Sequence, residues 1–337
     1  MGTTEVPAAA SQVHVLGGAT MGTLWQVSLV ASADADLHAL HDGIQACLDR
    51  VVAQMSTWEP DSDISRYNRA PAGSWQALPQ PFFEVLRQAL AIADASGGAC
   101  DPTVGPLVEA WGFGPHGPAG RMPDADTLAA ARARVGWERV VLDPAGQRVL
   151  QPGGVALDLS GIAKGHGVDA VVDWLRARAV PAALVEVGGE LRGYGRKPDG
   201  RPWTVLAEAW PDDAEPSGAA AAEGGRHAAP PCVLVLDGDA VATSGDYWHH
   251  FTHDGRSYSH TIDPRSGAPV DEAPAAVTVV ADTALAADAW ATALTVLGPT
   301  QGHALAEARG IAARFVTRTG DGVRERASDA FRQRLAQ

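Results

Sequence analysis

The chain of 337 residues is 46% hydrophobic and 20% charged, which is the composition of a globular protein and excludes a disordered chain. Its 26 Lys and Arg residues stand against 40 Asp and Glu residues, giving a net charge of −14. This balance excludes a broad nucleic-acid-binding face, because such faces need clustered basic side chains. A small phosphorylated ligand remains compatible with it, since a metal ion or a helix N-terminus can neutralise phosphate locally.

The N-terminal third is predicted to contain an arm, a strand and two helices. Residues 1–17 are mostly small and polar and are expected to form a flexible arm. Apolar and polar residues alternate over 25–29, the period of a half-buried strand. Over 36–55 apolar residues recur every three or four positions, which predicts an amphipathic helix. A second helix is predicted to follow Pro81 and to end at Gly97.

The rest of the chain mixes strands with helices. Further strands are predicted at 155–159, 182–187, 203–209, 232–236, 276–281 and 312–317. Further helices are predicted at 166–179, 284–297 and 300–309. The mixture indicates an α/β or mixed α+β fold rather than a bundle or a sandwich. A low-complexity stretch at about 211–231 is expected to be an insertion between two strands.

Targeting signals and cysteine pairs give little guidance. No run approaches the roughly 18 apolar residues of a membrane span, and the first residues lack the basic and apolar regions of a secretory leader. The protein is therefore expected either to be cytoplasmic or to have lost a leader. Cys47, Cys100 and Cys232 lie far apart and offer no zinc-binding spacing.

The segment 155–169 is the first candidate for chemistry. An alternating strand runs into a glycine-punctuated turn, and a helix leaves it. Backbone N–H groups at a helix start bind anions, and Lys164 adds positive charge where a phosphate would lie. The spacing is that of neither a Walker A loop nor a dinucleotide-binding G-x-G-x-x-G. An ordinary strand–turn–helix connection with a surface lysine is the alternative interpretation.

The second candidate is the pair Asp288 and Thr292, which a helix would place one above the other on one face. Their neighbours are small and apolar, so this face is expected to be partly buried. A carboxylate and a hydroxyl are hard oxygen donors of the kind that Mg²⁺ prefers. The alternative is that Thr292 bonds back to the carbonyl of Asp288, as is common in helices.

Three further segments carry suitable residue types. His260 precedes a turn at Asp263-Pro264, and its imidazole suits proton transfer near neutral pH. Two hydroxyls precede a glycine at 243–245, and glycine and proline shape a rigid loop at 96–107. Each is equally compatible with a purely structural turn. The motifs of serine hydrolases, zinc proteases and thiol-redox proteins are absent from the sequence, which argues against those classes.

Taken together, these segments resemble the ApbE family of flavin transferases, or FAD:protein FMN transferases. The matching motifs occur in family order over roughly residues 18–300: Met21-Gly22-Thr23, Ser56-Thr57-Trp58 with Asp61-Ser62, Ser65-Arg66-Tyr67-Asn68, Gly98-Ala99-Cys100-Asp101-Pro102-Thr103, Asp158 to Gly165, Gly188-Gly189-Glu190, Ala242-Thr243-Ser244-Gly245, His260-Thr261-Ile262-Asp263-Pro264, and Ala287-Asp288-Ala289 to Thr292. Each is weak alone, but their common order is hard to obtain by chance. The resemblance therefore outweighs the structural alternatives.

The resemblance implies a single domain over 18–337, with FAD in a cleft between two sub-domains and Mg²⁺ against its pyrophosphate. It implies that the metal ligands are the Gly161 carbonyl and the side chains of Asp288 and Thr292. It places FAD contacts at Met21, Trp58, Ala99, Cys100, Asp101, Asp158, Lys164 and the turn that ends at Ile262. His260 is the candidate base.

The implied activity is transfer of FMN from FAD to a Thr or Ser hydroxyl of another protein, with release of AMP. Typical targets are membrane-bound subunits, which implies the periplasmic face of the inner membrane, with the cytoplasm as alternative. An FAD pyrophosphatase that gives FMN and AMP, or a non-catalytic flavin-binding protein, are the competing hypotheses. The sequence departs from the common pattern at Trp58, Cys100 and Glu186, and it shows neither the leader signal nor the lipid-anchor signal expected for most members.

Overall fold

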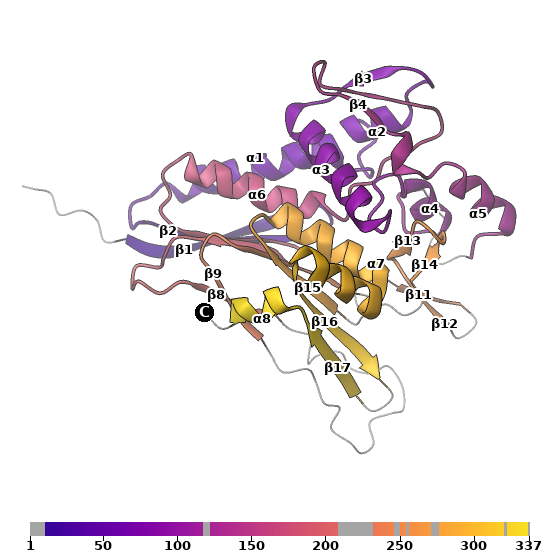
Figure 1. Ribbon diagram of the computed structural model, residues 1–337. Helices are drawn as coiled ribbons and strands as arrows, with labels where there is room; N and C mark the ends of the chain where they lie inside the picture. The colour runs from indigo at the N-terminus through magenta and orange to yellow at the C-terminus, as the bar shows by residue number, and fades with distance from the viewer. Residues whose placement is uncertain are drawn as a thin grey trace, which may run out of the picture.

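The fold is organised around one eight-stranded antiparallel sheet. The computed structural model describes residues 11–116, 122–207, 232–245, 250–253, 256–270, 276–319 and 322–335. The sheet has the strand order β1-β2-β6-β7-β10-β15-β16-β17 (Figure 1). Its strands are β1 (Ser11–Thr20), β2 (Thr23–Ser32), β6 (Ala183–Val187), β7 (Glu190–Tyr194), β10 (Ala240–Gly245), β15 (Ala276–Ala281), β16 (Ala312–Thr319) and β17 (Gly322–Ala327). The mixed α/β class expected from the sequence is confirmed.

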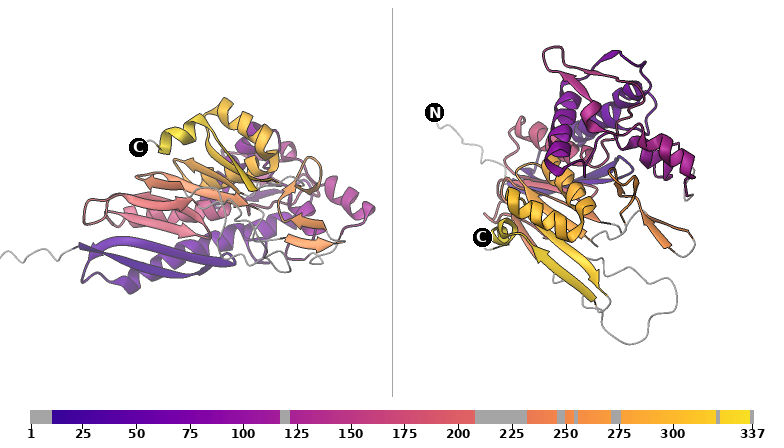
Figure 2. Two further views of the ribbon diagram at one scale, coloured as in Figure 1. Left: turned by 90° about the horizontal axis from the view of Figure 1, so that it is seen from below. Right: turned by 45° about the vertical axis from the view of Figure 1, so that its right-hand side comes forward.

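Three long helices cover one face of this sheet (Figures 1 and 2). They are α1 (Leu37–Met55), α6 (Ala163–Arg176) and α7 (Ala284–Arg309). Inward residues of β2 and β6 alternate with outward ones and pack on α1 and α6, as Val27 and Val185 do against Leu48 and Val172. This packing confirms the predicted helix at 36–55 and the strands at 25–29 and 182–187.

Helix α7 is divided near its middle. Gly298 has a φ of 72° and a ψ of 176°, which are not helical values, and Pro299 follows it. A proline at the first position of a new helical segment is favourable, because its missing N–H has no partner to lose there. The break confirms the two predicted helices at 284–297 and 300–309, which here run on as one element.

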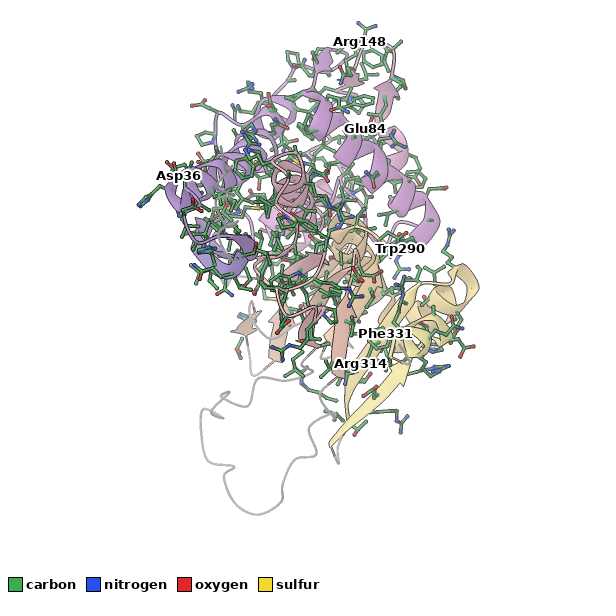
Figure 3. All side chains as sticks on the ribbon, turned by 90° about the vertical axis from the view of Figure 1, so that its left-hand side faces the viewer. Asp36, Glu84, Arg148, Trp290, Arg314 and Phe331 are labelled. Carbon is green, nitrogen blue, oxygen red and sulfur yellow. The ribbon has the colours of Figure 1, made fainter. Side chains whose placement is uncertain are left out.

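The opposite face of the sheet is partly covered by a hairpin and the last helix. The hairpin is β8 (Trp203–Ala207) with β9 (Cys232–Leu236), and the helix is α8 (Asp329–Leu335). Trp203, Leu234 and Phe331 belong to one buried cluster there, and Phe331 lies on the same side of β16 as Arg314 (Figure 3). The expected insertion at 211–231 lies outside the described residues.

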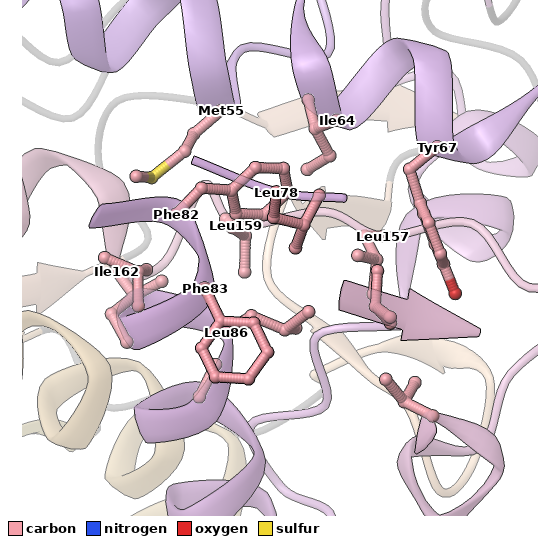
Figure 4. Packing of buried hydrophobic residues seen from close by; sticks show 14 of the residues in the cluster. Met55, Ile64, Tyr67, Leu78, Phe82, Phe83, Leu86, Leu157, Leu159 and Ile162 are labelled. Carbon is pink, nitrogen blue, oxygen red and sulfur yellow. The ribbon is translucent and has the colours of Figure 1, made fainter. Parts of the chain in front are cut away.

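A second layer packs on α1 and α7 on the side away from the sheet (Figure 1). It comprises α2 (Asp63–Asn68), α3 (Gln80–Ser96) and a three-stranded sheet of β3 (Trp75–Ala77), β5 (Arg148–Leu150) and β4 (Val141–Asp143). Met55, Phe82 and Leu159 pack together in its core (Figure 4). The predicted helix after Pro81 is confirmed, and Gly97 ends it in the left-handed conformation.

Short elements border the two layers at one end. They are α4 (Gly105–Ala110), α5 (Ala125–Arg132), the 3₁₀ turn η1 (Trp137–Arg139), and the hairpins β11 (His250–His253) with β12 (Arg256–Ser259) and β13 (Ile262–Asp263) with β14 (Ala268–Pro269). Leu107, Trp111 and Ile262 form a small buried cluster that joins α4 to β13. These contacts tie the His260 turn to the loop that follows α3.

The predicted strand at 155–159 is wrong. Its alternating burial is real, with Val155, Leu157 and Leu159 buried, but no strand pairs with it in the described part of the chain. Instead the Asn68 side chain accepts a hydrogen bond from Leu157 N at 2.7 Å and donates one to Leu157 O at 2.9 Å. One amide side chain thus replaces the neighbouring strand, while the apolar residues face the second layer (Figure 4).

Two further boundaries differ from expectation. The flexible arm expected over 1–17 is wrong from residue 11 onward, because 11–17 form most of β1, which pairs with β2 through its backbone. Residues 1–10 lie outside the described residues. Helix α6 begins at Ala163, three residues before the expected start, so Lys164 lies in its first turn. Among the described residues, no helix is long and apolar enough to cross a membrane.

Candidate active site

The candidate site lies where the N-termini of α6 and α7 meet. Gly165 N, in the first turn of α6, donates a hydrogen bond to Asp288 Oδ2 on α7 at 3.0 Å. A Cβ atom at Gly165 would lie 2.2 Å from the carbonyl oxygen of Ala284. Only glycine permits this approach of the two backbones, and Asp288 reaches the start of α6 for that reason.

Gly161 and Thr292 come together beside Asp288. A Cβ atom at Gly161 would lie 3.0 Å from Thr292 Oγ1, so the turn before α6 packs against this hydroxyl. Among the described residues no hydrogen bond from Thr292 to the carbonyl of Asp288 is found, so the alternative that Thr292 bonds back along its helix is not observed; Thr295 Oγ1 does so, donating to Ala291 O at 2.8 Å. The hydroxyl thus lies between α7 and the turn before α6.

Lys164 lies between two buried carboxylates. Its Nζ is 2.5 Å from Glu190 Oε1 and 3.9 Å from Asp288 Oδ1. Burial lowers the pKa of Lys164, but the charges of Asp288 and Glu190 outweigh it and leave that pKa raised. Burial, with the charge of Asp288, raises the pKa of Glu190 to about 8. Burial likewise raises the pKa of Asp288.

The loop after α3 lies close enough to the same aspartate for its charge to act on Cys100. Burial, together with the charges of Asp288 and Asp101, raises the pKa of the Cys100 thiol to about 12. Asp101 accepts hydrogen bonds from Thr103 N and Thr103 Oγ1, both at 2.7 Å, and from Trp137 N at 3.2 Å. Its carboxylate therefore holds the loop in shape, and with it the position of the fully buried Ala99.

Met21 lies at the tip of the β1–β2 hairpin. Met21 and Gly22 have φ values of 49° and 72°, as a two-residue hairpin turn requires. A Cβ atom at Gly167 would lie 3.2 Å from Met21 Cε. The methionine therefore packs on the first turns of α6, beside the candidate site.

Asp158 and Trp58 are held differently. Asp158 precedes the turn before α6, where its Oδ1 accepts from Ser160 N at 2.8 Å and its own N–H donates to Pro102 O at 2.8 Å. Trp58 lies in the loop between α1 and α2 with 63% of its surface exposed. Trp58 therefore does not pack in the core. No contact found among the described residues links its indole to the α6–α7 junction.

His260 and Ile262 lie in a separate part of this region. Ile262 is buried beside α4, and Trp111 Nε1 donates to Gly267 O at 2.9 Å across the β13–β14 hairpin. The half-buried His260 ring has its centroid 6.4 Å from that of Phe113, edge to face. A Cβ atom at Gly98 would lie 3.9 Å from Arg265 Cγ, which brings this hairpin against the Cys100 loop.

The donors at the α6–α7 junction suit a hard divalent cation. Asp288 and Thr292 supply side-chain oxygens, and the Gly161 carbonyl belongs to the turn packed on Thr292. In the described part of the chain Oδ1 of Asp288 accepts no hydrogen bond, and Glu190 Oε2 is buried without a partner. No group of three or more His, Cys, Asp or Glu side chains with metal-binding geometry occurs among the described residues. A site here would thus combine unlike oxygen donors, as Mg²⁺ sites do.

Sequence reasoning did not assign roles to two residues of the junction. Glu190 appeared only as part of a glycine motif, yet it holds Lys164. Asp169 on α6 accepts hydrogen bonds from Ala284 N at 3.0 Å and Leu285 N at 2.9 Å, the first two N–H groups of α7. The sequence shows Asp169 only as an acidic residue shortly after Lys164. Its role could not be predicted from that, because its partners lie more than 100 residues away in the chain.

Comparisons with known proteins agree with this architecture. A model of the ApbE family matches residues 21–315. The chain is 37% identical to an FAD:protein FMN transferase of Vibrio cholerae, covering 97% of this chain and 94% of that protein. It is 35% identical to one of Klebsiella pneumoniae, covering 96% and 89%.

Solved structures give the same result. The apo form of the Pseudomonas stutzeri flavinyl transferase ApbE superposes with a TM-score of 0.86 at 40% identity, covering 97% of this chain and 98% of that one. The flavin transferase ApbE from Vibrio cholerae superposes with a TM-score of 0.84 at 34% identity, covering 96% and 100%. The family match over most of the chain, with these near full-length relatives, leads to one assignment: the chain belongs to the ApbE family.

Proposed function

We propose that the chain is an Mg²⁺-dependent FAD:protein FMN transferase that moves FMN from FAD to a Thr or Ser hydroxyl of a target protein and releases AMP. Flavin transfer is supported by the family and by the names of the relatives. In this chain, the structural observation that supports the proposal is the α6–α7 junction. There a helix N-terminus, the Lys164 ammonium and the Asp288 carboxylate converge, the combination that a metal-bound diphosphate needs.

The reaction is a displacement at the phosphorus of the FMN half of FAD. The acceptor oxygen bonds to that phosphorus, the bond from phosphorus to the bridging oxygen breaks, and AMP leaves with the bridging oxygen. His260 takes the hydroxyl proton. When bound, Mg²⁺ would neutralise charge on the diphosphate. Asp288, Thr292 and the Gly161 carbonyl would hold it.

The other residues bind and orient the dinucleotide. Lys164 and the N–H groups at the start of α6 attract the diphosphate. We propose that the remaining contacts with FAD fall on Met21, Asp158 and Trp58 and on Ala99, Cys100, Asp101 and Ile262. Trp58, whose indole is exposed, would stack on a ring of FAD.

Mass spectrometry of a Thr-containing target peptide tests the transfer. The peptide is incubated with the protein, FAD and Mg²⁺, and the expected product carries one FMN per acceptor, with one AMP released. AMP without a modified peptide would favour the pyrophosphatase hypothesis. Neither product would favour a flavin-binding protein without turnover.

Asp288→Asn tests the metal site. The amide keeps an oxygen for Gly165 N–H but loses the charge, so Mg²⁺-dependent transfer should be abolished with the fold intact. Asp282→Asn is the matched control, because Asp282 lies two residues before α7 with its side chain 96% exposed. Equal activity in the two variants would remove Asp288 from the metal site.

His260→Ala tests the base. We expect transfer to slow by about 10²–10⁴-fold with FAD affinity retained, the usual range for loss of general base catalysis. A lost affinity with an unchanged rate of bound enzyme would make His260 a binding residue instead.

The acceptor protein and compartment rest on family resemblance. We propose a membrane-bound flavoprotein subunit as the acceptor and the periplasmic face of the inner membrane as the place of reaction. Fractionation of the cells that make this chain, with flavinylated proteins detected in each fraction by their fluorescence, tests both. Flavinylated protein in the cytoplasm alone would contradict them.

A further inference from the structure

Glu190 holds the Lys164 ammonium at the junction of α6 and α7. Only 4% of the Glu190 side chain and 6% of the Asp288 side chain are exposed, and Lys164 is their common partner. The ammonium is in hydrogen-bond contact with Glu190 but 3.9 Å from Asp288. Of the two carboxylates, Glu190 is thus the one hydrogen-bonded to the ammonium. Asp288 Oδ1 is therefore available to bind a metal ion.

The turn before Glu190 fixes both ends of this ion pair. Gly188 and Gly189 have φ values of 61° and 102°, which favour glycine and place Glu190 at the first position of β7. A Cβ atom at Gly188 would lie 3.3 Å from Lys164 Cδ and 2.9 Å from Thr23 Cγ2. The lysine stem therefore runs along this turn, and its head meets the carboxylate that follows.

An ammonium and a metal ion compete for the same carboxylate. A lysine released from Glu190 would need to move its Nζ by little more than 1 Å to pair directly with Asp288 Oδ1. A cation would then have to displace that charge from a buried carboxylate, where ion pairs are strong and costly to break. The position of Lys164 therefore decides whether Asp288 can receive a cation.

We infer that Glu190 is a positioning residue for the cation site: it holds the Lys164 ammonium so that Asp288 stays open to the metal and the ammonium lies beside it. This rests on the metal site of the proposed function. A divalent ion held by Asp288 would add a second positive charge close to the ammonium, and the two would together attract a diphosphate. Glu190 acts through Lys164 and needs no contact with the metal or the substrate.

A double-mutant cycle tests this without turnover. Mg²⁺ binding is measured by calorimetry, with no FAD present, for the wild type, Glu190→Gln, Lys164→Met and the double variant. We expect Glu190→Gln to weaken Mg²⁺ binding about tenfold, which equals about 1.4 kcal/mol. Lys164→Met added to it should restore the affinity to that of Lys164→Met alone, because no ammonium remains to occupy Asp288.

The competing explanation is that Glu190 acts only by its negative charge. Lys164→Met would then change the affinity by the same factor with and without Glu190, and this result would overturn the inference. Glu190→Asp keeps the charge but withdraws the carboxylate by one methylene, so we expect it to weaken binding as well. An unchanged affinity in Glu190→Asp would also overturn the inference. This variant provides the test if Glu190→Gln does not fold.

Loss of the proposed metal site and loss of the role of Glu190 give different experimental results. A wild-type protein that binds no Mg²⁺ would overturn the metal site of the proposed function together with this inference. A wild type that binds Mg²⁺, with an additive cycle, would overturn the role of Glu190 alone. Urea denaturation of each variant ensures that the affinities compared are those of folded protein.

Discussion

Asp169→Asn should destabilise the protein by removing a carboxylate that caps α7 from the neighbouring helix. Asp169 is 9% exposed, and its two oxygens accept from Ala284 N, Leu285 N and Arg192 Nη1 at 3.0, 2.9 and 2.7 Å. The next N–H of α7, that of Ala286, is capped by Thr283 Oγ1 at 3.2 Å. The first four N–H groups of a helix have no partner within it, and Asp169 accepts from two of those four in α7.

The magnitude follows from what asparagine retains. Asparagine has one side-chain oxygen where aspartate has two, so it cannot accept from all three donors. At least one hydrogen bond to a charged group is therefore lost, at a cost of about 1.5–3 kcal/mol. The Arg192 guanidinium, 12% exposed, loses its counter-charge, and breaking such a pair costs about 3–5 kcal/mol, a range that already includes the lost hydrogen bond. We expect the free energy of unfolding to fall by about 3–5 kcal/mol in total.

Urea denaturation followed by circular dichroism measures this change. Asp173→Asn is the matched control, because Asp173 lies one turn further along α6 and is exposed. It should alter the free energy of unfolding by less than about 0.5 kcal/mol. A change below about 1 kcal/mol for Asp169→Asn would refute the view that this carboxylate fixes α7.

Three further changes test the site. Gly165→Ala should destabilise by about 1–3 kcal/mol or more in urea, because its Cβ atom would lie 2.2 Å from Ala284 O. Trp58→Ala should weaken FAD binding, measured by titration, about tenfold or more through lost stacking of about 1–3 kcal/mol, with the free energy of unfolding unchanged since Trp58 is 63% exposed. Alkylation of Cys100 should accelerate with pH and show no plateau below about pH 11, because burial raises its pKa to about 12; Asp288→Asn should accelerate it by removing a charge that raises this pKa.

Each of these has a control in the same chain. Gly167→Ala should be tolerated, because its Cβ atom would meet only the flexible ends of side chains, the nearest being Met21 Cε at 3.2 Å; equal stability of the two alanine variants would contradict the close approach. Trp75→Ala should leave FAD affinity unchanged, and a matching loss would make the Trp58 effect indirect. Cys232, at the start of β9, should be unaffected by Asp288→Asn, whereas parallel acceleration would indicate general loosening.

The periodic spacing of apolar residues predicted the helices and strands that bury one face against a neighbouring layer. The helices at 36–55 and after Pro81 are confirmed because each has an apolar stripe that packs on a neighbouring layer. The segment 155–159 misled the same reasoning, since alternating burial says which side chains face the core but not what satisfies the backbone. There Asn68 supplies the hydrogen bonds that a strand would have given.

The candidate site could be predicted only where its residues are close in sequence. The four-residue spacing of Asp288 and Thr292 predicted a shared helix face, and both lie at the junction. The pairing of Lys164 with Glu190 and of Asp169 with Ala284 depends on contacts over 26 and 115 residues. No local pattern specifies such distant partners, so the sequence indicated the residue types but not their contacts.

The two helices at the junction cap one another. The start of α6 is capped by Asp288 from α7, and the start of α7 is capped by Asp169 from α6. Neither helix can fray at this end without taking an acceptor from the other, so the amide protons of Gly165, Ala284 and Leu285 should exchange with solvent in one cooperative opening. Since these contacts join parts of the chain more than 100 residues apart, closing them costs more chain entropy than closing a local contact. A chain in which either helix start opens therefore loses both caps of this junction at once.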